Sequence, residues 1–236
     1  MKVIFVGPTL RGAELPAHAA LCLRDPARQG DVYRAVMDGA NVIGLIDGVY
    51  EHVPAIWHKE ILYALSKGVR VYGAASMGAL RAAECAAFGM IGLGRIYNDL
   101  ISGTVQDDAE VAQLHAPPEL GFLPLTEPLA NVRATLAHGL EAGLITNDEY
   151  QKLLNAAGSI FFKDRTYKSI LSAVENMGTV RSAEVLALLK ANAIDQKLAD
   201  ARELIAAVLE APDSRSEPPT SWAFEPTEMW TTHLLS

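Results

Sequence analysis

The chain has 236 residues, of which half are hydrophobic and a fifth are charged, so it can build a packed core and is not disordered. Its net charge of -8 argues against a protein that binds nucleic acid or an anionic membrane. It has no apolar run of about 18 residues, the length a membrane-spanning helix needs. The two cysteines, Cys22 and Cys85, form neither a disulfide framework nor a C-x-x-C metal site. We therefore expect a cytoplasmic protein without a metal or another cofactor.

The first half of the chain has the pattern of a parallel α/β fold. Three short apolar runs, each closed by a turn, predict strands at 2–6, 42–46 and 69–72. Helices are predicted around 32–38, 55–67 and 77–88. This alternation of short buried strands and helices is typical of a parallel sheet, in which ligands bind at the carboxyl ends of the strands.

The second half is predicted to be mostly helical, with helices at 129–142, 167–176, 183–190 and 194–210 and a capping box at 146–149 that opens another. The expected organisation is an α/β core domain at 1–125, a helical region at 126–210 and a Pro/Ser-rich tail at 211–236. The tail carries Trp222, Phe224 and Trp230. It either packs back on the domain or docks on a partner.

The most distinctive local feature is the segment 73–78, GAASMG, which lies between a predicted strand and a predicted helix. Small residues around a serine in this position are typical of a nucleophile elbow, although Ala74 stands where the elbow has glycine. Ser76 would lie at a helix N-terminus, and the amide of Met77 could stabilise an oxyanion. Ser76 could also be only a helix cap, or the turn could bind phosphate.

A serine nucleophile needs a base, and Lys59 is the candidate. The residues three and four positions from it are apolar, so a helix over 55–67 would place this lysine in a desolvated setting. Desolvation lowers the pKa of a lysine and allows it to act as a general base. The alternative is a lysine of the first turn that reaches water, and the neighbouring His58 has a similar structural alternative.

Two further polar residues, Arg81 and Glu84, follow on the helix after Ser76. They lie three positions apart and could form an ion pair on one helix face. Alternatively, Arg81 could guide an anionic tail toward Ser76. The acidic residues at 107–110 could bind a hard cation, or could form a solvated loop.

Several segments together resemble the TfuA family. The segments that carry this resemblance are IFVGPTL at 4–10, IDG at 46–48, WHKE at 57–60, GAASMGALRAAE at 73–84, and DDAEVA at 107–112 with His115. The resemblance covers roughly the first half of the chain.

The resemblance implies a partner of YcaO enzymes in the formation of thioamides on a precursor peptide or protein. In that role the protein hydrolyses the C-terminal thiocarboxylate of a ThiS-like sulfur carrier. The hydrosulfide passes to the YcaO enzyme, which activates the amide oxygen with ATP. The family is associated with a Ser–Lys pair, which Ser76 and Lys59 match.

The mechanism expected from this resemblance begins when neutral Lys59 removes the proton of Ser76, which attacks the thiocarboxylate carbon. The Met77 amide and a second N–H, from the turn at Thr9 or at Asp47, would hold the oxyanion. Two other functions remain open. The protein could be a non-catalytic adaptor that enhances the binding of a YcaO enzyme to its substrate, or a phosphate- or nucleotide-binding module.

Overall fold

The computed structural model describes residues 1–13, 21–49, 51, 53–105, 107–175 and 177–234. The chain forms two compact units: an α/β unit of residues 1–106 and 198–236, and a helical unit of residues 107–197. These bounds differ from the expected divisions at 125 and 210. Residues 107–125 fall in the helical unit, and nearly all of helix α9 (Gln196–Glu210) falls in the α/β unit.

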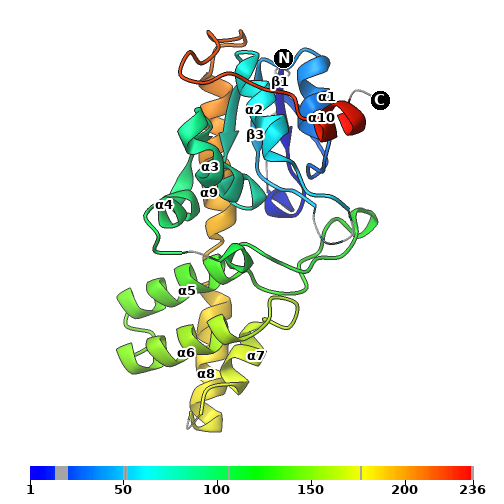
Figure 1. The fold of residues 1–236 in the computed structure, drawn as a ribbon. Coiled ribbons are helices and arrows are strands. Elements are labelled where there is room, and N and C mark those ends of the chain that lie inside the picture. The colour runs from blue at the N-terminus through cyan, green and yellow to red at the C-terminus, as the bar shows by residue number, and fades with distance from the viewer. Residues whose placement is uncertain (14–20, 50, 52, 106, 176, 235–236) are drawn as a thin grey trace. The chain divides into compact units, whose positions relative to one another are not determined.

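The α/β unit contains a five-stranded parallel sheet in the order β2-β1-β3-β4-β5 (Figure 1). This confirms the predicted fold class and the three predicted strands. Strands β2 and β5, which form the two edges, were not predicted. The strands are β1 (Lys2–Phe5), β2 (Leu21–Arg24), β3 (Val42–Leu45), β4 (Arg70–Gly73) and β5 (Ile91–Gly92).

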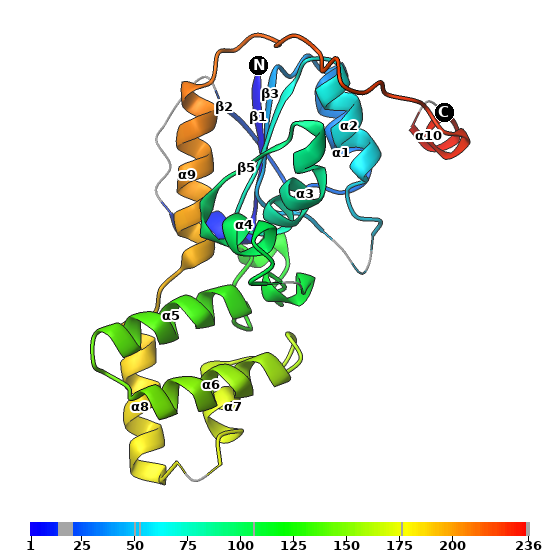
Figure 2. The same ribbon diagram turned by 60° about the vertical axis from the view of Figure 1, so that its left-hand side comes forward.

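Helices cover both faces of this sheet (Figure 2). Helices α1 (Asp31–Met37), α2 (His58–Ser66) and α3 (Met77–Cys85) lie on one face, where they bury apolar residues against Val3, Phe5 and Ile43. Helix α4 (Gly94–Ile101) follows β5. None of the helices in the described residues has both the length and the apolar character that crossing a membrane requires.

Helix α9 covers the other face of the sheet. Most of this helix therefore belongs to the α/β unit, although it was expected in the helical region. Leu204 and Val208 are fully buried against Ile4 and Val42. The helix lies so close to β3 that a Cβ atom at Gly44 would come within 2.7 Å of a Leu204 methyl group. A side chain at position 44 would therefore force Leu204 to shift, and residues 198–210 of α9 belong to the α/β core.

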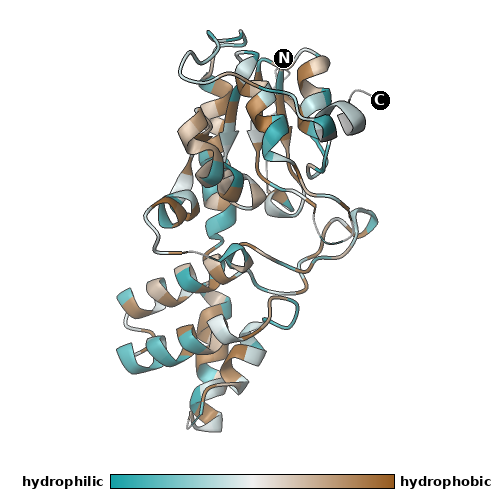
Figure 3. Cartoon of the chain, in the orientation of Figure 1, coloured by the Kyte–Doolittle hydropathy of each residue, from teal (hydrophilic) through white to brown (hydrophobic). Residues whose placement is uncertain are grey.

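The helical unit consists of four helices around a core of its own. These are α5 (Leu129–Glu141), α6 (Asn147–Ser159), α7 (Tyr167–Ser172) and α8 (Thr179–Ala191). Figure 3 shows apolar and polar residues alternating along α5 and α6, as expected of amphipathic helices. The apolar side chains meet in a cluster that includes Leu136, Leu153, Ile170 and Val185.

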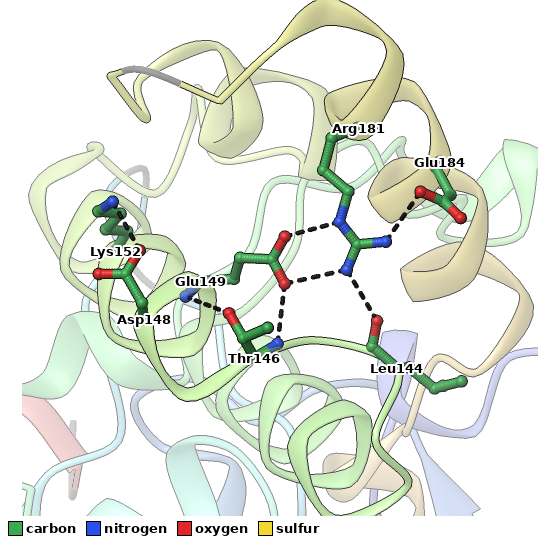
Figure 4. A network of polar contacts seen from close by, with 7 residues as sticks. All are labelled: Leu144, Thr146, Asp148, Glu149, Lys152, Arg181 and Glu184. Carbon is green, nitrogen blue, oxygen red and sulfur yellow. Dashed lines mark hydrogen bonds and ion pairs between the residues drawn. The ribbon is translucent and has the colours of Figure 1, made fainter.

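The predicted capping box opens α6. The Thr146 hydroxyl accepts from the Glu149 amide (3.2 Å), and the Glu149 carboxylate accepts from the Thr146 amide (2.8 Å). Arg181 of α8 donates to both oxygens of the same carboxylate, at 2.6 and 2.9 Å (Figure 4). Its hydrogen bonds lower the pKa of Glu149 to about 2. The cap therefore also joins α6 to α8.

The C-terminal tail packs back on the α/β unit, which is the first of the two alternatives stated above. It ends in helix α10 (Glu228–Leu234), close to α1 and α2 (Figure 1). Trp230 is only 2% exposed.

Candidate functional site

The carboxyl ends of β1, β3 and β4 place three turns of the chain at one edge of the sheet: residues 7–9, 47–48 and 74–76. The strand order reverses between β1 and β3. In open parallel sheets such a switch point is the usual place for a ligand. The candidate residues Thr9, Asp47 and Ser76 therefore belong to the edge at which chemistry is expected.

Asp47 is buried and holds the first two turns together. One carboxylate oxygen accepts from the amides of Gly7 (2.9 Å) and Thr9 (3.0 Å), and the other accepts from the Thr9 hydroxyl (2.6 Å). The structure thus brings Thr9 and Asp47 together at this edge of the sheet. Since the Thr9 amide already donates to this carboxylate, it does not supply the second oxyanion donor in this conformation.

The turn between β4 and α3 is strained and tightly packed. Ala75 has a φ of 66°, which is unusual for a residue with a side chain. A Cβ atom at Gly73 would lie 2.1 Å from the Gly78 carbonyl oxygen, and one at Gly78 would lie 1.8 Å from the Leu45 carbonyl oxygen. Small residues on both sides of Ser76 are therefore required for the turn to close, as in a nucleophile elbow.

Ser76 is the N-cap residue of α3, but its hydroxyl makes no capping hydrogen bond. The residue is half-buried, which leaves the hydroxyl free of the usual structural role of a serine in this position. Met77 is the first residue of α3, and amides of the first helical turn have no acceptor within the helix. The arrangement can therefore present a hydroxyl and an N–H donor at the same helix end.

Lys59 has surroundings other than those predicted. Helix α2 begins at His58 and not near 55, because the chain at Trp57 is still extended. Lys59 consequently lies in the first turn, where its Nζ atom donates to the Glu225 carbonyl (2.6 Å) and lies 5.1 Å from the centre of the Phe224 ring. Both partners belong to the C-terminal tail.

The hydrogen bonds of the described residues include none between Ser76 and Lys59. The Ser–Lys pair therefore stays a prediction. The expectation that apolar helix neighbours would surround Lys59 was wrong, because it assumed that α2 begins a turn earlier and did not take the tail into account.

Arg81 and Glu84 form the predicted ion pair, with 2.6 Å between the Arg81 Nη1 atom and the carboxylate. His58 contacts the same Glu84 oxygen at 2.8 Å, and the Arg81 Nε atom donates to the Ile56 carbonyl at 3.2 Å. These contacts fasten the start of α2 to α3. Arg81 is thus largely occupied by protein partners, which favours the structural alternative over the guidance of an anionic tail.

Glu60 is a buried residue whose importance the sequence did not reveal. Its carboxylate accepts from the amides of Gly30 (2.8 Å), Tyr33 (3.3 Å) and Trp57 (3.3 Å), so it caps α1 and α2 at once. Burial raises its pKa, and the three N–H groups oppose that rise. The spacing of Trp57 and Glu60 matches a capping box, but its contribution to α1 depends on tertiary structure.

The acidic segment at 107–110 is built into the helical unit. Glu110 is 4% exposed and forms an ion pair with Arg133. Burial raises its pKa, and Arg133 opposes the shift. The Asp107 carboxylate accepts from the Ala109 amide at 2.8 Å. Within the described residues, no group of three or more acidic, histidine or cysteine side chains is placed to bind a metal ion.

A family model described as "TfuA-like protein" matches residues 47–166, which are 120 of the 236 residues. The match begins at Asp47 and includes Lys59, Ser76, Arg81 and Glu84. It leaves out the first three strands and Thr9. No curated protein matches the chain.

Proposed function

The chain belongs to the TfuA family, and from this premise we propose that it releases sulfide for the thioamidation of a peptide or protein backbone. The substrate would be the C-terminal thiocarboxylate of a ThiS-like sulfur carrier, and a YcaO-type enzyme would use the hydrosulfide. The family assignment supports an accessory role in such a system. The hydrolytic reaction is our proposal from the residues of the site.

The observation that carries the proposal is the geometry around Ser76. Its hydroxyl makes no capping bond, although the residue occupies a cap position after a strained turn with Ala75 at a φ of 66°. Strain of this kind costs of the order of 1–3 kcal/mol and persists where the surrounding structure imposes it. Gly73 and Gly78 provide that constraint, since a side chain at either position would collide with backbone.

In the proposed reaction the Ser76 oxygen attacks the thiocarboxylate carbon and gives up its proton to a base. The base then returns this proton to the sulfur as the C–S bond breaks, so hydrosulfide leaves and an acyl-serine forms. Water hydrolyses this ester and regenerates the hydroxyl. The Met77 amide and the N-terminus of α3 would stabilise the oxyanion of each tetrahedral intermediate. Lys59 can serve as the base only in a conformation in which its amine is not held by Glu225.

The test is the release of sulfide from a thiocarboxylated carrier by the Ser76→Ala variant. We expect a loss of at least about a hundredfold, since removal of a nucleophile abolishes the covalent route. Ser102→Ala is the matched control, because Ser102 is an exposed residue just after α4, in the same unit. Retained sulfide release by a folded Ser76→Ala protein would refute the assignment of the nucleophile.

The second candidate function is a non-catalytic adaptor for a YcaO enzyme. It is favoured by the contacts of Lys59 with the tail and of Arg81 with Ile56 and Glu84, which are structural contacts. An adaptor would stimulate thioamidation equally well after Ser76→Ala when sulfide is supplied directly. It would not release sulfide from the carrier. The same pair of assays therefore distinguishes the two functions.

A further inference from the structure

The first part of the C-terminal tail is firmly seated on the α/β unit. The Asp213 carboxylate contacts the N-terminal amine of Met1 at 2.5 Å. The Ser216 amide donates to the Gly68 carbonyl at 2.7 Å, and a Cβ atom at Gly68 would lie 2.1 Å from the Ser216 carbonyl oxygen. Backbone contacts of this kind fix the path of the chain up to about residue 216.

The last part of the tail is held mainly by aromatic side chains. The ring of Tyr63 lies 5.4 Å from that of Phe224 and 5.1 Å from that of Trp230. Tyr33 of α1 is 5.4 Å from the Trp230 ring, in an edge-to-face arrangement. These distances are typical of favourable aromatic pairs. Four rings, two from the tail and two from α1 and α2, therefore form an aromatic clasp (Tyr33, Tyr63, Phe224 and Trp230).

The described backbone of this part of the chain forms no element of the sheet. Residues 222–227 belong to neither a helix nor a strand. Among the described residues, the backbone hydrogen bonds of 217–234 stay within the tail itself, as between the Thr231 amide and the Thr227 carbonyl. Side-chain bonds join it to the body of the unit through Trp222, which donates to the Phe88 carbonyl, and through Lys59. The segment can thus detach without breaking the sheet.

We propose that residues 223–234 form a releasable strap that withholds the Lys59 amine from the proposed catalytic edge. The inference rests on the proposed function, because it concerns the base of that reaction. With the strap closed, the Glu225 carbonyl and the Phe224 ring take up the ammonium group. Loss of the aromatic clasp removes both partners together, since Phe224 belongs to the clasp and Glu225 is the next residue. Lys59 then becomes available for chemistry.

The direct test is the rate at which an N-hydroxysuccinimide ester acylates Lys59, followed by peptide mass spectrometry at one fixed pH. Trp230→Ala should raise this rate at least about tenfold, because a cation–π contact and a charge-assisted hydrogen bond are lost together. Lys152 is the internal reference, because it lies on α6 and pairs with Asp148. An unchanged ratio of Lys59 to Lys152 acylation would overturn the proposal.

Trp222→Ala is the matched control variant. Trp222 also belongs to the tail, but it contacts Phe88 and not the aromatic clasp, so its loss should leave Lys59 protected. A second variant, the chain ending at Ser221, removes the strap altogether and should reproduce the effect of Trp230→Ala. A synthetic peptide of residues 221–236 should restore the protection of Lys59 in the shortened chain. Failure of the shortened chain to expose Lys59 would also refute the strap.

Sulfide release separates this inference from the proposed function. If the strap controls the base, the shortened chain should release sulfide several-fold faster than the full chain, and Ser76→Ala should abolish both rates. A full chain with Ser76-dependent activity that is not raised by shortening would overturn the strap and leave the proposed function intact. Absence of sulfide release from every variant would refute the proposed function, and the acylation rates would still decide whether the strap closes over Lys59.

Discussion

Replacement of Asp47 tests how the turns of the candidate site are held in place. In Asp47→Ala, the amides of Gly7 and Thr9 lose their acceptor. The loss is costly because Thr9 is buried. Each buried N–H left without a partner costs about 1–3 kcal/mol, so the expected loss of unfolding free energy is about 2–5 kcal/mol. Asp47→Asn should cost only about 1 kcal/mol. Its carbonyl oxygen can still accept from both amides, while its NH₂ group donates to the Thr9 hydroxyl.

Urea denaturation followed by tryptophan fluorescence measures this loss in the right part of the molecule. Trp57, Trp222 and Trp230 are the three tryptophans of the chain, and all belong to the α/β unit. Asp148→Asn serves as the control, because Asp148 forms an exposed ion pair with Lys152 in the helical unit. The reasoning would be refuted if Asp47→Ala cost less than about 1 kcal/mol, or if the asparagine variant were as unstable as the alanine variant.

Substitutions at Gly78 and Arg81, both on the helix that follows Ser76, test the packing of this helix and the role of its ion pair. Gly78→Ala should lower the stability of the α/β unit by several kcal/mol in the urea assay, because the new Cβ atom would lie 1.8 Å from the Leu45 carbonyl oxygen. The control Gly158→Ala, in an open position of α6, should stabilise the helical unit by about 0.4–1 kcal/mol, measured by hydrogen exchange of α6 peptides. Arg81→Ala should lower the fluorescence midpoint and leave the KM for the carrier nearly unchanged; a raised KM with an unchanged midpoint would restore the guiding role of Arg81.

The sequence was sufficient to predict the features that depend on local chemistry. Short apolar runs closed by Gly or Asp-Gly gave β1, β3 and β4, and the spacing of Thr146 and Glu149 gave the cap of α6. The small residues of the segment 73–78 indicated a tight strand-to-helix turn, which the structure confirms. In each case a few neighbouring residues determine the conformation, so the pattern is visible without knowledge of the fold.

The features that were missed depend on contacts between distant parts of the chain. The packing of α9 on β3 at Gly44 was not predicted, because Leu204 lies far from Gly44 in the sequence. Lys59 was expected among its helix neighbours, but its partners come from residue 224 and beyond. The edge strand β5 has only two residues and gave no apolar run. Helical periodicity describes the sides of one element and carries no information on which distant segment covers each side.

The carboxyl groups of Glu60, which is buried, and Glu149, which is paired with Arg181, predict that the stabilities of the two units change with pH in opposite directions. Burial raises the pKa of Glu60 in the α/β unit above its ordinary value of 4.5. Its protonated form therefore favours folding, and this contribution is complete below about 4.5 and is lost as the pH rises through the folded pKa. Arg181 lowers the pKa of Glu149 in the helical unit to about 2. This contribution is complete above 4.5 and is lost as the pH falls toward 2.

The two contributions can be separated with glutamine variants, which keep the shape of the side chain but do not titrate. The urea midpoint of wild type minus that of Glu60→Gln, read by tryptophan fluorescence, should fall as the pH is raised from about 4.5. The corresponding difference for Glu149→Gln, read by hydrogen exchange of α6 peptides, should fall as the pH is lowered from 4.5 toward 2. The ion pair with Arg181 is partly screened by solvent, so its size should also decrease with added salt. If both differences changed in the same direction, burial would not be the dominant influence on Glu60, and its three N–H partners would have to outweigh it.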